Sequence, residues 1–504
     1  MGIFVLLILL SLGFLGWGLI QARRSGRAGL LVWLQGALLV LPWLVFLGLF
    51  ATGLTLDPLA LLILLVGTTG GYIWVGRLVR ATMREQQEQL RRGTEFDLRP
   101  DARSGLEPAN TEDDVIVPEQ SAIPEADLQT IRGFFGIDTF FVTESFPFRQ
   151  GVIFKGNLRG KAALIYPVLS EKLQTYFQDR YRLLLVSDEE GKPAVIVVPT
   201  DQDPFQPPPI NVLVNVGLLV LTVFALVQMS ALFMGVDVFT APERIPETLP
   251  IACGVFTVLV VHEIAHYWQA KRYGVKLGLA YPIPLLTPIA VPPLGFVLFP
   301  GSFGSFTRFE SPAPDRKALF DISLAGPVAG GALALACLVV GLLLSGTTNQ
   351  TGALVLEPEY LGVSTLVGLL AGLLVGPVSD GQMVALHPLA VVGFLGLYIT
   401  ALTLLPSGKL DGGRIVQAVF GRKTARTTGI ITLLLLAAAG IFFPQFLYWA
   451  AVLFVLGRAP ERPPLDEITE TDSRRDILAL VALFVMAAVL LPLAPQFAAR
   501  LGLG

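Results

Sequence analysis

Residues 249–270 read LPIACGVFTVLVVHEIAHYWQA, an apolar run long enough to cross a membrane that nevertheless contains two histidines and a glutamate. His262 and His266 are just over one helical turn apart, so both imidazoles project from one helix face and can hold one metal ion. Glu263 lies beside them as the natural base for a water molecule at that metal. Each charged group placed in hydrocarbon costs about 2.5 to 3.5 kcal/mol even on lenient insertion scales. The stretch therefore predicts a functional site, most simply that of a zinc hydrolase within the bilayer.

The composition is typical of a polytopic membrane protein. Of the 504 residues, 53% are hydrophobic and only 15% are charged, and the mean hydropathy is +0.67. A net charge of -3 gives no electrostatic footprint for nucleic acid, so no nucleic-acid partner is expected. The two cysteines, Cys253 and Cys337, both fall in apolar segments, which excludes a disulfide framework and a cysteine-rich zinc cage. A metal must therefore be held by histidine and carboxylate.

Hydropathy predicts about eight membrane-spanning helices, at residues 1–20, 30–52, 59–79, 210–234, 249–270, 318–345, 387–406 and 477–495. Two further apolar stretches, 361–376 and 427–456, are shorter or broken, and the first is expected to re-enter or lie on the surface. Arginines follow the first and third spans, so the positive-inside rule places both loops in the cytoplasm and the N-terminus outside. No basic residue precedes the first span, which is therefore expected to be an anchor rather than a cleaved signal.

The fold class predicted is an all-α polytopic membrane protein with a small cytoplasmic α+β insert. Composition divides the chain into an anchor of three spans (1–80), a cytoplasmic linker (81–122), an α+β module (123–204), an intramembrane core that carries the metal motif (205–424) and C-terminal transmembrane segments (425–504). Within the module the patterns predict helices at 125–134 and 169–178, extended segments at 139–142 and 151–155, and a hairpin of 181–186 with 194–198.

A second string, Leu410-Asp411-Gly412-Gly413-Arg414, is predicted to lie at the same membrane depth as the two histidines. If residues 361–385 do not cross, the span at 387–406 runs inward and ends at this string. Asp411 then becomes the third ligand, because catalytic zinc keeps three protein ligands and one open position. Gly412 and Gly413 would let the backbone bend near the metal. His387 is expected to begin a helix rather than to act as a fourth ligand.

The pairing of these two strings resembles the site-2 protease family of intramembrane zinc metalloproteases, and more narrowly its EGY branch of plants and cyanobacteria. Four further strings carry the narrower resemblance, which covers roughly residues 127–421: Gly156-Asn157-Leu158-Arg159-Gly160, Gly301-Ser302-Phe303-Gly304, Leu324-Ala325-Gly326-Pro327 and His387-Pro388-Leu389.

The resemblance implies that His262, His266 and Asp411 bind Zn²⁺ and that Glu263 is the general base. It implies an endopeptidase that cleaves transmembrane protein substrates near the cytoplasmic face. The membrane would be the plasma or thylakoid membrane of a bacterium, in particular a cyanobacterium.

Two further regions bear on the expected protease site: Thr403 and residues 281–304. Many family members carry Asn eight residues before the ligand aspartate, where it can stabilise the oxyanion, whereas this chain has Thr403, with one donor and a shorter reach. Residues 281–304 contain six prolines and three glycines and are too broken to span. They are expected to form either a surface loop or a strand pair near the metal, in which Gly301, Ser302, Phe303 and Gly304 would bind an extended substrate by β-augmentation.

Two other classes of function stay open at this point. In a proton- or metal-coupled transporter, His262, Glu263, His266 and Asp411 would form a relay, although the chain shows no evident inverted repeat. In a membrane scaffold the same residues would have no catalytic role. The module at 123–204 either contacts the cytoplasmic tail of a substrate or a cytoplasmic partner protein, or is a passive spacer.

Overall fold

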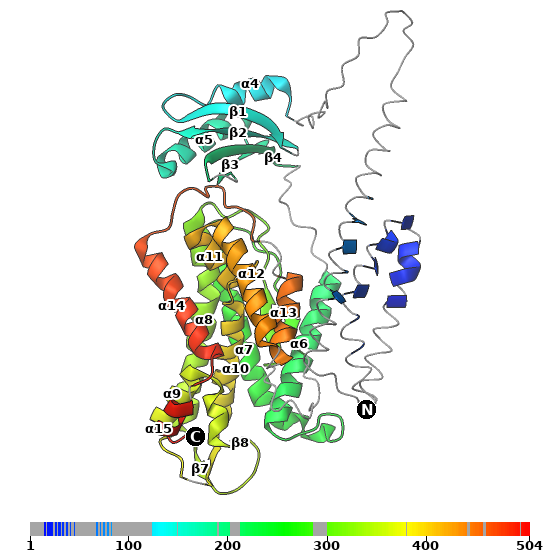
Figure 1. The fold of residues 1–504 in the computed structure, drawn as a ribbon, viewed down its shortest axis with the longest axis vertical. Helices are drawn as coiled ribbons and strands as arrows, with labels where there is room; N and C mark the ends of the chain where they lie inside the picture. The colour runs from blue at the N-terminus through cyan, green and yellow to red at the C-terminus, as the bar shows by residue number, and fades with distance from the viewer. Residues whose placement is uncertain are drawn as a thin grey trace, which may run out of the picture. The chain divides into compact units, whose positions relative to one another are not determined.

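The computed structural model describes residues 123–503 except 149, 189–190, 202–211, 286–299, 380, 441–443, 457–459 and 494, together with scattered residues up to 82. The chain forms two compact units, Met1–Ile116 with Leu434–Ala451 and Val117–Leu433 with Val452–Gly504. Most residues of the three spans expected in 1–80, and nearly all of the linker at 81–122, lie outside the described residues. Every residue of the two metal strings lies in the second unit, whose elements Figure 1 labels.

Three helices of the second unit are long and apolar enough to cross a membrane: α6 (Val212–Phe233), α7 (Ile245–Arg272) and α8 (Arg316–Leu343). They coincide with the predicted spans at 210–234, 249–270 and 318–345. These three are the candidates among the described residues, so the expected total of about eight spans stays a prediction. The apolar α9 (Thr365–Leu374) has ten residues, or about 15 Å, which is half the hydrocarbon thickness. The stretch at 361–376 is therefore too short a helix to cross, as expected.

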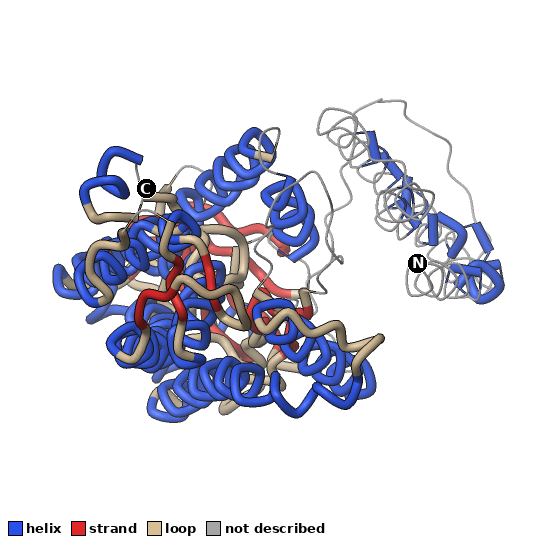
Figure 2. The backbone as a smooth tube through the Cα atoms, turned by 90° about the horizontal axis from the view of Figure 1, so that it is seen from below, coloured by secondary structure: helices blue, strands red, loops and turns tan. Residues whose placement is uncertain are grey.

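The remaining elements of the helical part follow in chain order. After α10 (Pro388–Thr403) come α11 (Asp411–Phe420), α12 (Arg422–Ala439), α13 (Pro444–Leu456), α14 (Ser473–Leu490) and α15 (Pro495–Arg500), with 3-10 turns η1 (Pro242–Arg244) and η2 (Pro358–Val363). Two small antiparallel sheets accompany them: β5 (Tyr281–Pro284) with β6 (Ser302–Phe306), and β9 (Met383–Ala385) between β7 (Gly346–Thr348) and β8 (Val355–Leu356). Figure 2 shows many of the helices nearly end-on.

Glycines bring α8 and α10 into backbone contact. A Cβ on Gly341 would lie 2.0 Å from the backbone nitrogen of Ala390, and one on Gly393 would lie 2.2 Å from that of Leu338. In lipid the hydrophobic effect does not stabilise contacts between helices, so van der Waals packing of closely approaching backbones stabilises them instead. The first turn of α8 is fixed by Asp315, whose side chain accepts a hydrogen bond from the Ala318 N–H at 2.7 Å. These contacts hold α8 close to α10, the helix that precedes the second metal string.

The α+β module is an antiparallel sheet of order β1-β2-β4-β3 with two helices, α4 (Glu125–Arg132) and α5 (Ala162–Phe177). The strands are β1 (Phe140–Phe148), β2 (Gly151–Leu158), β3 (Tyr181–Ser187) and β4 (Pro193–Pro199). Both helices bury one face of the sheet in a common apolar core. The predicted helices and hairpin are confirmed, but α5 begins seven residues earlier than expected, at Ala162. The sequence reading started this helix after Pro167, because an interior proline normally marks a helix boundary.

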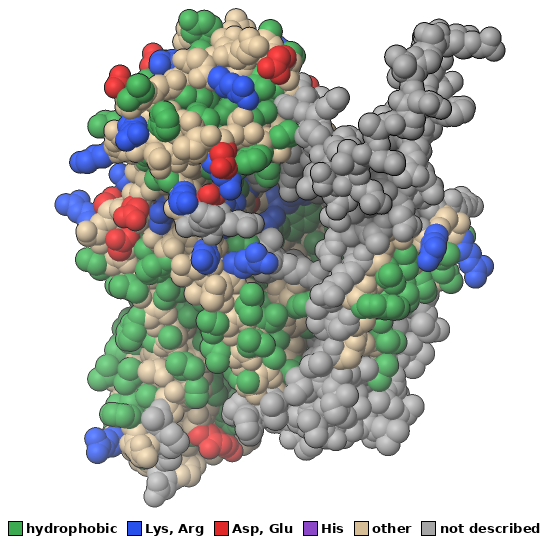
Figure 3. Space-filling model, turned by 45° about the horizontal axis from the view of Figure 1, so that its top comes forward, with side chains coloured by type: hydrophobic (Ala, Val, Ile, Leu, Met, Phe, Trp, Pro, Cys, Tyr) green, Lys and Arg blue, Asp and Glu red, His purple; other side chains and the backbone are tan. Residues whose placement is uncertain are grey.

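A segment beyond α13 joins the module to the helical core. Residues 461–467, here called the strap, run beside β3, where Leu185 donates to the Leu465 carbonyl at 2.8 Å and Glu467 donates back to Leu185 at 2.9 Å. On its other side Leu465 donates to Ala313, which precedes α8, at 2.9 Å. The strap thus covers the edge strand of the module's sheet. Figure 3 shows charged side chains gathered over the module, whereas hydrophobic side chains cover the helices.

Candidate metal centre

Three buried side chains converge where α7 meets the start of α11. The Nε2 atom of His262 lies 3.1 Å from Nε2 of His266 and 3.1 Å from Oδ2 of Asp411, and His266 Nε2 lies 3.5 Å from Asp411 Oδ1. All candidate ligand atoms lie within 4.8 Å of one another. Donors around one tetrahedral zinc, each about 2.0 to 2.2 Å from it, are separated by about 3.3 Å. The donor set therefore fits a zinc ion with three protein ligands and one open position.

The tautomer of His266 is fixed by a backbone carbonyl on α8. Its Nδ1 lies 2.7 Å from the oxygen of Ile322, and because a carbonyl can only accept, Nδ1 carries the proton. The lone pair of Nε2 is then free and points at the cluster. Such an outer contact orients a metal-binding imidazole and raises its basicity. This contact joins residues 56 positions apart in the chain and therefore could not be predicted from sequence patterns.

Glu263 is held by two hydroxyl groups that the sequence reading missed. Ser305, in β6, donates to one carboxylate oxygen, and Thr307, directly after β6, donates to the other at 2.5 Å. Residues two apart in a strand point to the same face, so the pair meets Glu263 together. Two hydroxyl residues spaced two apart, directly after the Gly301–Gly304 string, were the one feature of the sequence that indicated Ser305 and Thr307. The carboxylate has a fixed orientation beside His262.

Gly326 lets α8 reach the two histidines. A Cβ at this position would lie 2.2 Å from Nε2 of His266 and 2.6 Å from Nε2 of His262, where no real Cβ can lie. One turn later, a Cβ on Gly330 would lie 3.0 Å from Cβ of His262. The sequence reading of Gly326-Pro327 as a site of close helix packing is confirmed. The structure adds that the packing partners are the imidazoles themselves.

The Gly326→Ala variant is expected to lose most zinc affinity and about 100-fold in proteolysis, because the added methyl must displace a ligand nitrogen and small misplacements have effects of that size. Gly331→Ala on the same helix is the matched control: its Cβ would meet only the Thr400 methyl carbon, at 3.6 Å. Zinc content and reporter cleavage should be measured for both variants. Wild-type zinc affinity in Gly326→Ala would contradict this geometry.

Gly412 and Gly413 have a different role from the bend that the sequence suggested. Both lie in the first turn of α11, which begins at Asp411. A Cβ on Gly412 would lie 1.8 Å from the Leu404 carbonyl oxygen, and one on Gly413 would lie 2.5 Å from that of Gly408. The two glycines therefore allow α11 to pack directly on the turn that precedes it, which fixes the position of the Asp411 carboxylate.

Thr403 and His387 both bond to backbone in α10. The Thr403 hydroxyl donates to the Thr400 carbonyl at 3.0 Å, which uses its single donor, and its methyl group faces Gly304. In this arrangement it has no donor left for an oxyanion. His387 accepts a hydrogen bond from the Leu389 N–H at 3.2 Å and caps the helix, as expected.

The string Gly301 to Gly304 belongs to a strand pair rather than to a surface loop. Ser302 and Phe303 are fully buried, and the Ser302 hydroxyl donates to the Ile283 carbonyl at 3.1 Å. Gly301 and Gly304 have φ values of +78° and +95°, which favour glycine. Residues 286–299, between the two strands, lie outside the described part. All four residues of this string are buried, and the two side chains point into the protein.

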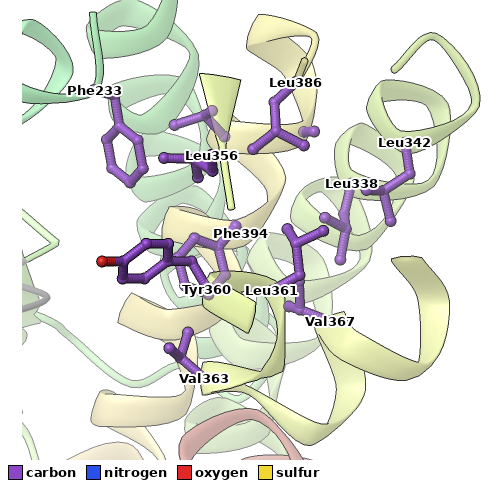
Figure 4. Close-up of a pocket in the computed structure, with 12 residues that line it drawn as sticks. Phe233, Leu338, Leu342, Leu356, Tyr360, Leu361, Val363, Val367, Leu386 and Phe394 are labelled. Carbon is purple, nitrogen blue, oxygen red and sulfur yellow. The ribbon is translucent and has the colours of Figure 1, made fainter. Parts of the chain in front are cut away.

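A separate cavity of about 230 Å³ lies away from the metal cluster. It is lined by Leu338 and Leu342 of α8, Phe394 of α10 and Tyr360 of η2, among other apolar residues (Figure 4). Leu338 is more than three helical turns beyond Gly326, or about 18 Å along α8. Its lining contains no carboxylate, imidazole or thiol. This cavity therefore has no groups for hydrolysis, and the chemistry belongs to the cluster.

Comparison with known proteins agrees with this geometry. The model of the EGY3 middle domain matches residues 129–204, and that of peptidase family M50 matches residues 250–444. Probable zinc metalloprotease EGY1, chloroplastic, of Arabidopsis thaliana is 33% identical over 78% of this chain and 75% of its own. Probable zinc metalloprotease EGY2, chloroplastic, of the same plant is 34% identical over 73% and 65%. No solved structure matches the chain.

These matches decide between the classes of function left open by the sequence. The relatives are named probable zinc metalloproteases, and the stretch that matches the peptidase family contains His262, His266, Asp411 and Glu263. A transporter and a non-catalytic scaffold are not favoured. The enzyme is a zinc metalloprotease of the membrane, with Zn²⁺ as its cofactor. The chain belongs to the EGY zinc metalloproteases, a branch of the site-2 proteases in peptidase family M50.

Proposed function

We propose that the protein cleaves transmembrane protein substrates inside the bilayer near its cytoplasmic face. His262, His266 and Asp411 would hold the zinc, and Glu263 would be the general base. The observation that carries the proposal is the convergence of two imidazoles and one carboxylate in an otherwise apolar helical environment. Zinc bound there supplies a Lewis acid that polarises the scissile carbonyl and acidifies water.

Glu263 moves the proton in this proposal. Hydrogen bonds from Ser305 and Thr307 hold its carboxylate beside His262. From there it takes a proton from the attacking water and passes it to the nitrogen of the leaving amine. The buried ligands and the close contact of α8 with His262 and His266 keep bulk water away from the cluster. Proton transfer is therefore confined to Glu263 and the water that reacts.

The depth of the cluster supports cleavage near the cytoplasmic end. The helix α7 ends with Lys271 and Arg272, which the positive-inside rule places in the cytoplasm. His266 precedes Arg272 by six residues, or about 9 Å, within a hydrocarbon layer of about 30 Å. The scissile bond would therefore lie in the cytoplasmic third of the substrate's span.

An extended substrate is best placed along β6. A peptide bond in a helix is inaccessible, so the substrate must unwind, and a strand edge stabilises the unwound backbone. The strand β6 pairs with β5 along one edge, and it carries Ser305, which contacts Glu263. In this proposal the backbone of Gly301 to Gly304 binds substrate, whereas the buried side chains of Ser302 and Phe303 fix the strand.

Cleavage of designed reporters tests the proposal. Each reporter has one apolar span of about 20 residues, a helix-breaking Asn-Gly pair at a chosen depth and a tag at each end. In proteoliposomes with the zinc-loaded protein, we expect scission next to breaks in the cytoplasmic third and little at breaks in the opposite third. Mass spectrometry of the products locates the bond. Scission only outside the span, or preferred scission in the opposite third, would contradict the proposed site.

We also propose that the module handles substrates. It contains no histidine or cysteine, so it offers no second metal site of those ligands. Its second edge strand, β1, exposes Phe141 and Phe146 by 43% and 45%, whereas the strap covers β3. Gly156 to Leu158 end β2, the strand next to β1, and Arg159 and Gly160 follow it. Among the described residues no further strand pairs with the outer edge of β1, and this edge suits the extended cytoplasmic tail of a substrate, or a cytoplasmic partner protein, by β-augmentation.

Replacing residues 123–204 by a flexible linker should lower cleavage selectively. Reporters that carry a native cytoplasmic tail should lose cleavage, whereas tailless reporters should be cleaved at the wild-type rate. Membrane insertion and zinc content are measured first, because the strap loses its contact with Leu185 in this variant. Equal rates for tailed and tailless reporters would leave the module as a spacer.

We also propose that the protein lies in a membrane of a photosynthetic cell. The protein is a membrane protein, and the relatives quoted are plant proteins named chloroplastic. These names support a membrane of a photosynthetic cell, such as a thylakoid, and give no support to the bacterial origin expected from the sequence.

A further inference from the structure

One arginine connects the ligand helix, the strand that holds the base, and the strap. Arg414 lies in α11, three residues after Asp411, and only 2% of it is exposed. Its Nη2 atom donates to the Thr307 carbonyl at 2.6 Å, and the Thr307 hydroxyl in turn donates to Glu263 at 2.5 Å. One guanidinium, carried by the helix that begins at Asp411, therefore contacts the backbone of the residue that holds Glu263.

The charge of Arg414 is balanced by Glu461, the first residue of the strap. Arg414 donates to Oε2 of Glu461 from Nε at 3.1 Å and from Nη2 at 2.8 Å. Glu461 is 7% exposed, and its other oxygen accepts from the Arg462 N–H at 3.1 Å. Burial raises the pKa of Glu461, but the cations of Arg414 and Lys409 outweigh this effect, so the pKa lies below its usual value. The pair is ionised and desolvated.

Other groups restrict how the guanidinium can move. The ring centroids of Phe309 and Phe306 lie 4.8 and 5.7 Å from its central carbon, which is within the range of a cation–π contact. Gln417, one turn further along α11, donates to the backbone carbonyl of Glu461 at 3.0 Å. The strap is therefore attached to α11 by a side-chain ion pair and by a separate hydrogen bond, and both are buried.

We infer that Arg414 and Glu461 are positioning residues that hold Asp411 and Glu263 in register for catalysis. The inference rests on the proposed function, because it assigns these residues to the same metal site. Neither residue touches the reacting atoms. Arg414 acts on Asp411 through α11 and on Glu263 through Thr307, while Glu461 keeps the buried guanidinium in place. The beginning of the strap, which lies between the apolar stretches at 427–456 and 477–495, thereby supports the active site.

The Glu461→Gln variant tests the inference with two readouts. Zinc affinity, measured by competition with a chromogenic chelator, should fall about tenfold, because α11 carries Asp411. At saturating zinc, kcat for a reporter that the wild type cleaves should fall about 10- to 100-fold with little change in KM, as is typical when outer-shell support is lost. Wild-type values of both zinc affinity and kcat would overturn the inference.

A matched control lies on the same strap. Glu467 is also 7% exposed and forms an ion pair with Arg422 at 3.3 Å. Within the described part of the chain it forms no hydrogen bond or ion pair with Arg414, Thr307 or Asp411. Glu467→Gln should therefore keep wild-type kcat and zinc affinity, whatever it does to Tm. An equal loss of kcat in both variants would show that any weakening of the strap impairs activity, and would overturn the specific role of Glu461.

Two further variants separate positioning from mere structure. The double variant Arg414→Met/Glu461→Leu removes both buried charges, so Tm should recover relative to Glu461→Gln, while kcat should stay low because Thr307 loses its partner. Recovery of kcat together with Tm would overturn the inference.

Thr307→Val should lower kcat, whereas Thr307→Ser, which keeps the hydroxyl, should retain wild-type kcat. A wild type that neither binds zinc nor cleaves any reporter would instead refute the proposed function.

Discussion

Glu263→Gln is expected to keep the fold and the zinc but to lose about 10²- to 10⁴-fold in proteolysis, the contribution of a positioned general base. The amide is nearly isosteric with the carboxylate and is not a zinc ligand in the cluster. Its oxygen can still accept one hydrogen bond from Ser305 or Thr307, but it cannot take a proton from water. Zinc content, Tm and reporter cleavage should be measured on the same preparation.

The matched control is Glu247→Gln, the same substitution near the other end of α7. Glu247 is exposed and pairs with Arg244 at 2.9 Å, a surface ion pair of small energetic value. Its substitution should change neither cleavage nor zinc content. If Glu263→Gln cleaved reporters at the rate of Glu247→Gln, Glu263 would not be the base.

The metal cluster could be predicted because its signals are local or follow from simple counting. The spacing of His262 and His266 fixes a common helix face, and the parity of the spans brings Asp411 to the same depth. In the structure the candidate ligand atoms of these three residues lie 3.1 to 3.5 Å apart, as this proximity requires, and their role as zinc ligands stays a proposal. Hydropathy also located the ends of α6, α7 and α8 to within four residues, because the ends of a long apolar run closely mark the ends of the helix.

The support of the cluster could not be predicted, because it consists of contacts between distant residues. Ser305 and Thr307 meet Glu263 across 42 and 44 positions, and Arg414 meets Glu461 across 47. Periodicity reports which face of an element is buried, but not what that face touches. The strap illustrates the same limit: residues 461–467 have no pronounced pattern, and their structure is set by the partners on both sides.

Gly412 and Gly413 show that a residue can be correctly placed near the site from sequence although its expected role is wrong. Gly412 and Gly413 were singled out for backbone freedom, yet both are helical, and the need for glycine comes from carbonyl groups 1.8 and 2.5 Å from the absent Cβ atoms. Thr403 was considered as an oxyanion donor, but its hydroxyl bonds within α10. In each case the sequence identified a position near the site, while its role depended on neighbours that only the fold brings together.

The zinc content of purified wild-type protein and of Asp411→Ala, determined by elemental analysis, tests the central claim most directly. Loss of outer-shell support typically costs 10- to 100-fold in metal affinity, so loss of a ligand should cost at least about 100-fold. His387→Ala is the matched control, since His387 caps α10 and is not part of the cluster among the described residues. We predict one zinc per chain in the wild type and in His387→Ala, and little or none in Asp411→Ala. An equal zinc content in all three, or none in the wild type after incubation with zinc, would contradict the assignment of His262, His266 and Asp411 as the zinc site.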